Sequence, residues 1–332
     1  MASPPSILSI LVTFILCISK TFVSGQFANF EKLQLPGGVT GPGGITFGGL
    51  PIPNEGPFVT TNDGGIMKWV DPTIGFVDFA YTSPTRTKEL CDGVTDPDTA
   101  STCGQPFALS YHPVTHNLYI ADAYHGLLVV GPDGGLATQL AGGFKFVNDV
   151  DIDLLTGHLY FIDASLTYTI SDAIKPGFIP DSSGRLLRYD PLTQEVSVLL
   201  SGLSGGGGVV VSSDGTFVLV SEIGSDRITK YWLVGPKANT AEVLLHVNGN
   251  PNKIKQAETL GEFWVATTRI GYAPPTPGIV PEGVRFNSDG DVLQTLQFGT
   301  EYPDEPISLV QEHEGKLYVG SRFTNFVGVY SN

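Results

Sequence analysis

A turn followed by a short run of β-branched and aromatic residues recurs along the chain. The clearest copy lies in residues 213–233 (SDGTFVLVSEIGSDRITKYWL), where an Asp-Gly turn precedes the run 217–222 and a Gly-Ser-Asp turn precedes the run 227–233. Two such runs joined by a short polar turn predict a β-hairpin. Weaker copies of the first run, each ending in small or acidic residues, follow turns at positions 56, 116, 157, 261 and 315.

These strand starts indicate how the whole chain is organised. Together with the copy at Gly215, they are separated by 41 to 60 residues, which leaves room each time for about four short strands and their loops. A repeat of this length built only of strands is typical of a propeller blade, because radial repetition hides most sheet edges. We therefore predict an all-β fold, a six-bladed β-propeller, with one irregular β-sandwich as the alternative.

The composition is that of one large folded domain. Charged residues make up 15% of the chain and hydrophobic residues 41%, so a large core can be buried. The 18 basic and 33 acidic residues give a net charge of -15, which argues against nucleic acids and anionic membranes as partners. We expect residues 26–332 to form a single domain and a monomer that takes a small-molecule ligand or substrate.

The N-terminal segment has the features of a signal peptide. Residues 7–18 are mostly apolar and are followed by Val23-Ser24-Gly25, which suits cleavage by signal peptidase, and the run is too short for a comfortable membrane span. We predict a signal peptide over residues 1–25, entry into the secretory pathway, no membrane attachment after cleavage, and a vacuolar or extracellular destination. A signal anchor is the alternative, because no Lys or Arg precedes the apolar run.

Cleavage would remove Cys17 and leave two cysteines, Cys91 and Cys103. They flank residues 92–102, a loop rich in Asp, Pro, Gly and Thr with little apolar content to hold it. One disulfide that closes this loop is the natural inference for an oxidising compartment.

Two motifs suggest chemistry but have plainer interpretations. Residues 147–153 predict a strand with Asp149, Asp151 and Asp153 on one face, and we expect a solvated face rather than a calcium loop, because the Gly and Glu of an EF-hand loop are missing. Residues 202–206 match Gly-x-Ser-x-Gly, but glycines lead from this serine into a strand and not into a helix, so we interpret the match as chance.

Two longer loops, the insertions at residues 166–183 and 270–281, interrupt the regular succession of short strands. Loops of this length in a compact β-protein often cover or shape a binding site. We expect these two insertions to form the rim of the site.

In its longer motifs the chain resembles the plant strictosidine synthase-like proteins, from the segment before the first strand to the last strand. The stretches that carry the resemblance are 88–93 (KELCDG), 121–135 (ADAYHGLLVVGPDGG), 184–191 (GRLLRYDP), 227–233 (RITKYWL) and 311–315 (QEHEG). The resemblance implies a six-bladed propeller with a ligand pocket at one end of its axis, a secretory or vacuolar location, and a disulfide between Cys91 and Cys103.

The resemblance also places the candidate site residues. It puts Phe146, Asn148, Ile223, Ser308 and Arg322 around the ligand, with Ser308 at the position of the glutamate that acts as general base in strictosidine synthase. A serine cannot take up a proton as a carboxylate does at neutral pH unless another base activates it. The resemblance therefore implies an enzyme of plant specialised metabolism that performs an amine–carbonyl condensation or another ring-forming step, rather than strictosidine synthase itself.

Arg322 stands where strictosidine synthase has an apolar residue. An arginine in a largely apolar pocket needs an anionic partner, which a ligand carboxylate, phenolate or phosphate would supply. The alternative is that Arg322 turns outward and pairs with Glu301, Asp304 or Glu305, and both interpretations stay open here.

The resemblance extends to paraoxonase-type hydrolases, which hold calcium in the central tunnel. Their ligand positions fall at Gly43, Asn148, Gly207, Asn252 and Lys253, so only Asn148 keeps the expected ligand. Calcium takes about six to eight oxygen ligands, several of them anionic. We therefore expect no metal and no cofactor, and we keep an ester or lactone hydrolase and a non-catalytic small-molecule binder as alternatives.

Overall fold

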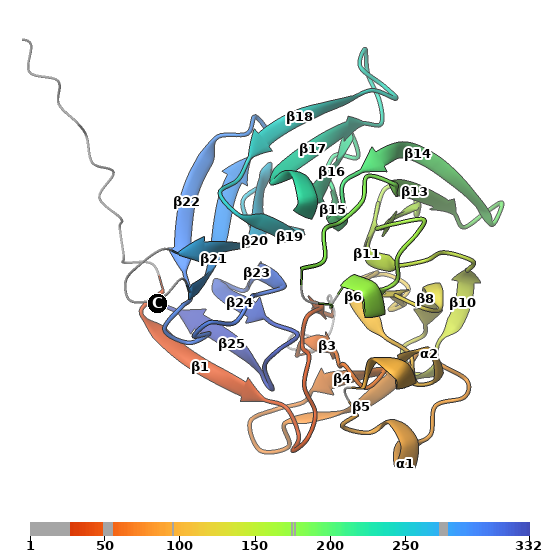
Figure 1. The fold of residues 1–332 in the computed structure, drawn as a ribbon, viewed down its shortest axis with the longest axis vertical. Coiled ribbons are helices and arrows are strands. Elements are labelled where there is room, and N and C mark those ends of the chain that lie inside the picture. The colour runs from red at the N-terminus through yellow and green to blue at the C-terminus, as the bar shows by residue number, and fades with distance from the viewer. Residues whose placement is uncertain (1–26, 49–55, 95, 174, 176, 272–277) are drawn as a thin grey trace, which may run out of the picture.

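The computed structural model describes residues 27–332 apart from 49–55, 95, 174, 176 and 272–277. Six sheets surround a central axis (Figure 1), so the predicted six-bladed β-propeller is confirmed. The predicted signal peptide lies outside the described residues. Within them, no helix has the length and apolar character needed to cross a membrane.

The first three blades follow one another in chain order, and each runs outward from an innermost strand. Blade one contains β2 (Ile45–Thr46), β3 (Phe58–Thr60), β4 (Gly65–Trp69) and β5 (Phe76–Tyr81), with β9 (Gly135–Leu136) added in parallel at its outer edge. Blade two contains β6 (Pro106–Tyr111), β7 (Leu118–Asp122), β8 (Gly126–Val130) and β10 (Thr138–Ala141). Blade three contains β11 (Val147–Ile152), β12 (Leu159–Asp163), β13 (Gly184–Asp190) and β14 (Glu195–Leu203).

The remaining blades repeat this order. Blade four contains β15 (Gly206–Val211), β16 (Phe217–Glu222), β17 (Arg227–Trp232) and β18 (Ala241–His246). Blade five contains β19 (Asn250–Gln256), β20 (Glu262–Gly271), β21 (Gly278–Asn287) and β22 (Val292–Gln297). Blade six contains β23 (Leu309–His313), β24 (Lys316–Gly320), β25 (Phe326–Ser331) and, at its outer edge, β1 (Asn29–Gln34).

The N-terminal strand closes the ring. β1 pairs antiparallel with β25, with Phe30 opposite Tyr330 and Gln34 opposite Phe326. The last blade is thus completed by the first strand of the chain, which joins the two ends of the chain in one sheet.

The strand starts predicted from the repeated motif are confirmed. The turns at 56, 116, 157, 215, 261 and 315 directly precede β3, β7, β12, β16, β20 and β24, the second strands of the six blades. The clearest copy of the motif forms the β16–β17 hairpin, in which Glu222 is paired with Arg227.

The core fills the spaces between neighbouring blades. Val150 of blade three packs in one cluster with Ala108 of blade two, and Trp264 of blade five packs in another with Val310 of blade six. Each fully buried large apolar side chain contributes about 1.5–3 kcal/mol. Packing between blades therefore supports the scaffold and leaves the loops at its ends available for a site.

The acidic face of β11 is not solvated, and that prediction was wrong. The carboxylates of Asp149 and Asp151 accept hydrogen bonds from the backbone N–H groups of Val209 and Val211, each at 2.9 Å, on β15 of the next blade. Innermost strands have no neighbouring strand on their axial side, so their free N–H groups need other acceptors. The third carboxylate, on Asp153, is buried in the following turn.

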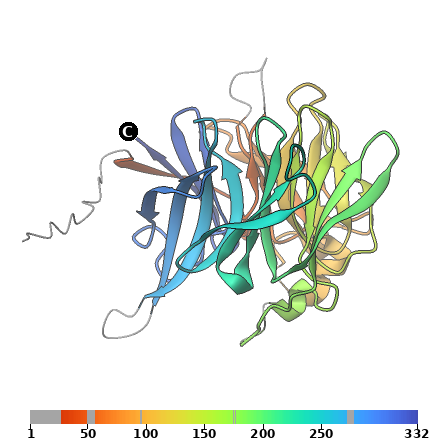
Figure 2. The same cartoon turned by 90° about the horizontal axis from the view of Figure 1, so that it is seen from above.

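Short helices lie at one end of the propeller, along the lower edge of the view in Figure 2. They are α1 (Lys88–Cys91), η1 (Pro97–Thr99), α2 (Ala100–Cys103), α3 (Ile170–Ala173) and η2 (Ile223–Ser225). A disulfide joins Cys91 at the end of α1 to Cys103 at the end of α2, the pairing that the sequence predicts.

Candidate functional site

The six innermost strands begin at the same end of the axis. Every blade repeats one topology, and each innermost strand lies beside the next around the ring, as β6 does beside β11 and β19 beside β23. Residues at their starts are therefore neighbours in space although they are far apart in the chain. Phe107, Asn148, Lys253 and Ser308 meet at this end.

Four of these strands carry a β-bulge in their first residues. Register shifts occur at Phe107 in β6, at Asn148 in β11, at Gly207 in β15 and across Asn252 and Lys253 in β19. A bulge turns a side chain away from the regular alternation of the strand, and bulges are frequent beside functional sites. In these four blades, the residue at the bulge near the start of the innermost strand is therefore unpaired and can face this end of the axis.

Polar side chains at the ends of the second strands hold the segments that lead into the bulges. Asp122 accepts a hydrogen bond from the N–H of Gln105 at 2.7 Å, and Asp163 accepts one from the N–H of Phe146 at 3.2 Å. Thr60 accepts from the N–H of Gly44 in the same way in blade one. This explains why the repeated strands end in small or acidic residues: those residues fix the backbone on which the site is built.

Arg322 points into this end of the molecule. Its guanidinium carbon lies 4.0 Å from the ring centre of Phe107, and its Nε and Nη2 atoms lie 3.4 Å from the Oδ1 atom of Asn62. Its backbone N–H donates to Ser308 Oγ at 3.3 Å. Burial lowers the pKa of Arg322 to about 10.

The alternative for Arg322, an outward ion pair, is not observed. In the part of the chain that the structure describes, no carboxylate of Glu301, Asp304 or Glu305 pairs with Arg322. Its side chain instead contacts a ring face and an amide oxygen, both uncharged. The inward interpretation is the one that agrees with the geometry.

Lys253 provides a second cation, which is buried, beside the same ring. It is 2% exposed, its Nζ atom lies 5.7 Å from the ring centre of Phe107, and it donates to the backbone oxygen of Asn148 at 3.3 Å. Burial lowers the pKa of Lys253 to about 8, with Asp149 opposing the effect and the positive charges of Lys255 and Arg322 adding to it. Two cations therefore lie beside one aromatic ring.

The predicted ligand residues are brought together, although their roles differ. Ser308 is buried and links the two cations, because its carbonyl accepts from the N–H of Lys253 at 3.2 Å. The amide of Asn148 donates to the carbonyls of Gly206 and Gly207 and is thereby occupied in joining blades three and four. Phe146 packs edge-on against Phe107 at 5.1 Å.

Ile223 and the first insertion border this cluster. Ile223 begins η2 and is half-buried. In the insertion 166–183, Tyr168 packs against Phe146 at 6.3 Å and against Phe178 at 4.6 Å. The predicted rim thus contacts the site at this insertion, whereas much of the second insertion, 270–281, falls outside the described residues.

Sequence reasoning missed Phe107 and Asn62. Phe107 lies within an apolar run, PFALSY, where it looks like an ordinary core residue. A blade-by-blade alignment of the innermost strands would have placed it at the bulge that Asn148 occupies in the next blade. Nothing in the local sequence around Asn62 marks it as a partner of Arg322.

The positions that correspond to the calcium ligands of paraoxonase-type hydrolases do not fit a metal cation. A Cβ atom on Gly43 would lie 2.5 Å from Cγ of Arg322, so the arginine fills the space into which a glutamate at position 43 would project. The Nζ atom of Lys253 adds positive charge at another of the five positions. Among the described residues there is no group of three or more His, Cys, Asp or Glu side chains that could hold a metal.

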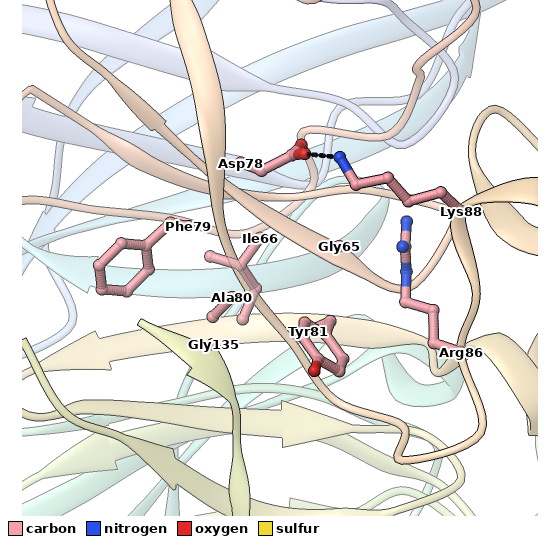
Figure 3. Close-up of a pocket in the computed structure, with 9 residues that line it drawn as sticks. All are labelled: Gly65, Ile66, Asp78, Phe79, Ala80, Tyr81, Arg86, Lys88 and Gly135. Atoms are coloured by element: carbon pink, nitrogen blue, oxygen red, sulfur yellow. Dashed lines mark hydrogen bonds and ion pairs between the residues drawn. The ribbon is translucent and has the colours of Figure 1, made fainter. Parts of the chain in front are cut away.

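A separate cavity of about 320 Å³ lies beside β5 on the outer part of blade one (Figure 3). It is lined in part by Arg86 and Lys88, but each of these has a partner: Arg86 pairs with Asp92 at 2.7 Å, and Lys88 pairs with Asp78 at 2.6 Å. These charges are already neutralised, and none of the predicted site residues lines the cavity. The end of the axis is the stronger candidate site.

Comparisons with known proteins agree with this architecture. Residues 148–236 match the family model described as strictosidine synthase. STRICTOSIDINE SYNTHASE-LIKE 11 from Arabidopsis thaliana is 37% identical over 334 residues, covering 99% of both chains. Strictosidine synthase from Catharanthus roseus is 38% identical over 286 residues, covering 83% of this chain and 80% of that protein.

Solved structures of more distant proteins share the fold. A gluconolactonase from Xanthomonas campestris superposes with a TM-score of 0.61 at 13% identity, covering 91% of this chain and 89% of that one. A calcium-binding protein, regucalcin, from Agrobacterium tumefaciens has the same score and identity, covering 92% and 93%. At this identity they support the fold alone, whereas the relatives above, at more than 30% identity over most of their length, establish that the chain belongs to the strictosidine synthase-like family.

Proposed function

We propose that this protein is a metal-independent enzyme of specialised metabolism that acts on a small molecule bearing an anionic group, bound at the end of the propeller axis. The reaction class is an amine–carbonyl condensation or another ring-forming step. One observation carries the proposal: Arg322 is turned inward onto Phe107 and has no carboxylate partner among the described residues.

A half-buried guanidinium without a carboxylate partner among the described residues favours an anionic ligand. Removing a charge from water is costly unless it is paired, and arginine matches a carboxylate with two parallel hydrogen bonds. Lys253 adds a second positive charge beside the same ring. The aromatic side chains of Phe107, Phe146 and Tyr168 offer flat apolar surface for the body of the ligand.

Ser308 makes strictosidine synthesis itself a poor fit. Its hydroxyl accepts a hydrogen bond from the N–H of Arg322. The charged group beside it is thus the cation of Arg322 and not a carboxylate that could act as a base. The buried carboxylate of Asp149 on β11 is occupied by the N–H groups of Val150 and Val209. A different group must move protons in this site.

The cellular setting follows from the sequence features. We propose secretion after removal of residues 1–25 and a vacuolar or extracellular location, because the disulfide of Cys91 and Cys103 suits an oxidising compartment. We also propose a monomer that binds a small-molecule substrate, with no nucleic acid and no membrane as partner.

Incubation of the purified protein with panels of amines, aldehydes and esters, read by mass spectrometry, tests the proposal. Each carbonyl compound should be supplied with and without a carboxylate. Condensation products that require the carboxylate support the proposal. Ester hydrolysis would instead favour a hydrolase, and binding of acids without turnover would favour a non-catalytic binder.

A further inference from the structure

We propose that Lys253 forms an imine with the carbonyl carbon of an oxo acid, an aldehyde or ketone whose carboxylate is held by Arg322. The inference names the substrate class and the reacting atom of the same site, and it rests on the proposed function. In strictosidine synthase-type chemistry both reacting groups belong to substrates, whereas here one amine would belong to the protein.

The two cations are placed to hold one small bifunctional molecule. The Nζ atom of Lys253 and the guanidinium carbon of Arg322 lie 5.7 Å and 4.0 Å from the same ring centre, so their separation cannot exceed the sum of these distances. Ser308 also links their backbones, through its Oγ and its carbonyl. A carboxylate and a carbonyl within a few carbon atoms of each other match such a pair.

Lys253 has the surroundings of a nucleophilic lysine. It is 2% exposed, and in the described part of the chain no carboxylate forms an ion pair with it. Lys255, two residues later on the same strand, instead lies 4.0 Å from Asp149. A desolvated lysine beside another cation loses its proton readily, and the lowered pKa of Lys253 agrees with this.

Arg322 can move to admit the ligand. Both of its hydrogen bonds to Asn62 Oδ1 are 3.4 Å long, well beyond the usual 2.9–3.0 Å for an N–H donor, and are therefore weak. A substrate carboxylate would replace these contacts with stronger, charge-assisted ones. The face of Phe107 would then be available to the body of the ligand.

The step balances without an oxidant or reductant. The lone pair of neutral Lys253 Nζ forms a bond to the carbonyl carbon, and the carbonyl π electrons move to oxygen, which takes a proton lost from nitrogen. Loss of the second nitrogen proton with that hydroxyl group releases one water and leaves a C=N bond. Uptake of one proton by the imine nitrogen gives an iminium ion, whose carbon is more electrophilic than that of the ketone and can accept a second nucleophile in a ring-forming step.

Reductive trapping tests the inference. Full-length mature protein would be incubated with phenylpyruvate and cyanoborohydride at pH 7–8, and the modified lysine identified by peptide mapping. Phenylacetone, which has the same ketone but a methyl group in place of the carboxylate, is the matched probe. Binding of phenylacetate, which has the carboxylate but no ketone, is measured in parallel.

We expect labelling at Lys253 with phenylpyruvate, labelling about tenfold slower with phenylacetone or in Arg322→Leu, and no label at this position in Lys253→Arg. Lys230 is the internal control, because it is also buried, between Phe217 and Trp232, but lies outside the site. Circular dichroism spectra would establish that the variants are folded.

The outcomes separate the two proposals. Binding of phenylacetate with no adduct at Lys253, or labelling of Lys230 at the same rate, overturns the imine and leaves the anion site standing. Neither binding nor labelling in the folded protein overturns both.

Discussion

Arg322 of blade six reaches over the start of blade one to Phe107 of blade two, with its guanidinium carbon 4.0 Å from the ring centre. The path is open because position 43 is a glycine, where a Cβ atom would lie 2.5 Å from Cγ of Arg322. A larger side chain at position 43 would therefore force the Arg322 side chain to move. Glycine at this position allows the guanidinium group to lie at this end of the axis.

A glutamate at position 308 should compete with an anionic ligand. We expect Ser308→Glu to weaken phenylacetate binding about tenfold or more, because the new carboxylate would pair with the guanidinium of Arg322, whose backbone N–H is 3.3 Å from Ser308 Oγ. Ser308→Gln has the same size without the charge and should weaken binding much less. Equal losses in the two variants, measured by titration, would mean that bulk and not charge is responsible.

Lys253 should lower the free energy of unfolding at neutral pH. Its pKa falls from 10.5 to about 8 on burial, so between these values the folded protein binds fewer protons than the unfolded chain, and stability rises with pH. The penalty is full below pH 8 and disappears as the pH approaches 10.5. We expect Lys253→Met to raise the free energy of unfolding at pH 7 by about 1–3 kcal/mol, less the loss of the hydrogen bond to Asn148.

Denaturant unfolding at several pH values between 7 and 10.5 would measure this effect. Lys255→Met is the control, and it should destabilise the protein, because it removes the cation beside Asp149. A Lys253→Met protein that is less stable than the wild type at pH 7 would contradict the account.

Calcium should leave the protein unchanged. None of the five positions expected to bind it carries a carboxylate, and one of them carries the ammonium group of Lys253. Thermal midpoints in millimolar calcium, in magnesium and in chelator should therefore agree. A tight ligand would stabilise by several kcal/mol, and a calcium-specific rise of several degrees would refute this description of the site.

The disulfide should stabilise the segment between α1 and α2. Cys91 and Cys103 are separated by 12 residues, for which loop closure gives about 3 kcal/mol. We expect the Cys91→Ala, Cys103→Ala double variant to lose about this much free energy of unfolding. Peptide mapping of the native protein without reductant should recover the bridge, and two free thiols in secreted material would overturn this prediction.

The sequence contains more information about the strands within each blade than about the contacts between blades. The second strands were predictable because turns and apolar runs such as residues 217–222 are local signals. The role of Asp149 was not, since a carboxylate that binds the free edge of the next blade has the same local pattern as a solvated one. Likewise, Arg322 and Lys253 were identifiable by resemblance, but the ring of Phe107 that they share is visible only once three blades are placed around one axis.

The most direct test of the central claim is the affinity of the protein for phenylacetate and for phenylacetamide, which has the same skeleton but no charge, in the wild type and in Arg322→Leu. Ligand-observed nuclear magnetic resonance measures such affinities even when they are weak. We predict that the wild type binds phenylacetate at least about tenfold more tightly than the amide, and that Arg322→Leu keeps its fold and loses this preference. Equal binding of the two compounds to the wild type, or unchanged phenylacetate affinity in Arg322→Leu, would contradict the account.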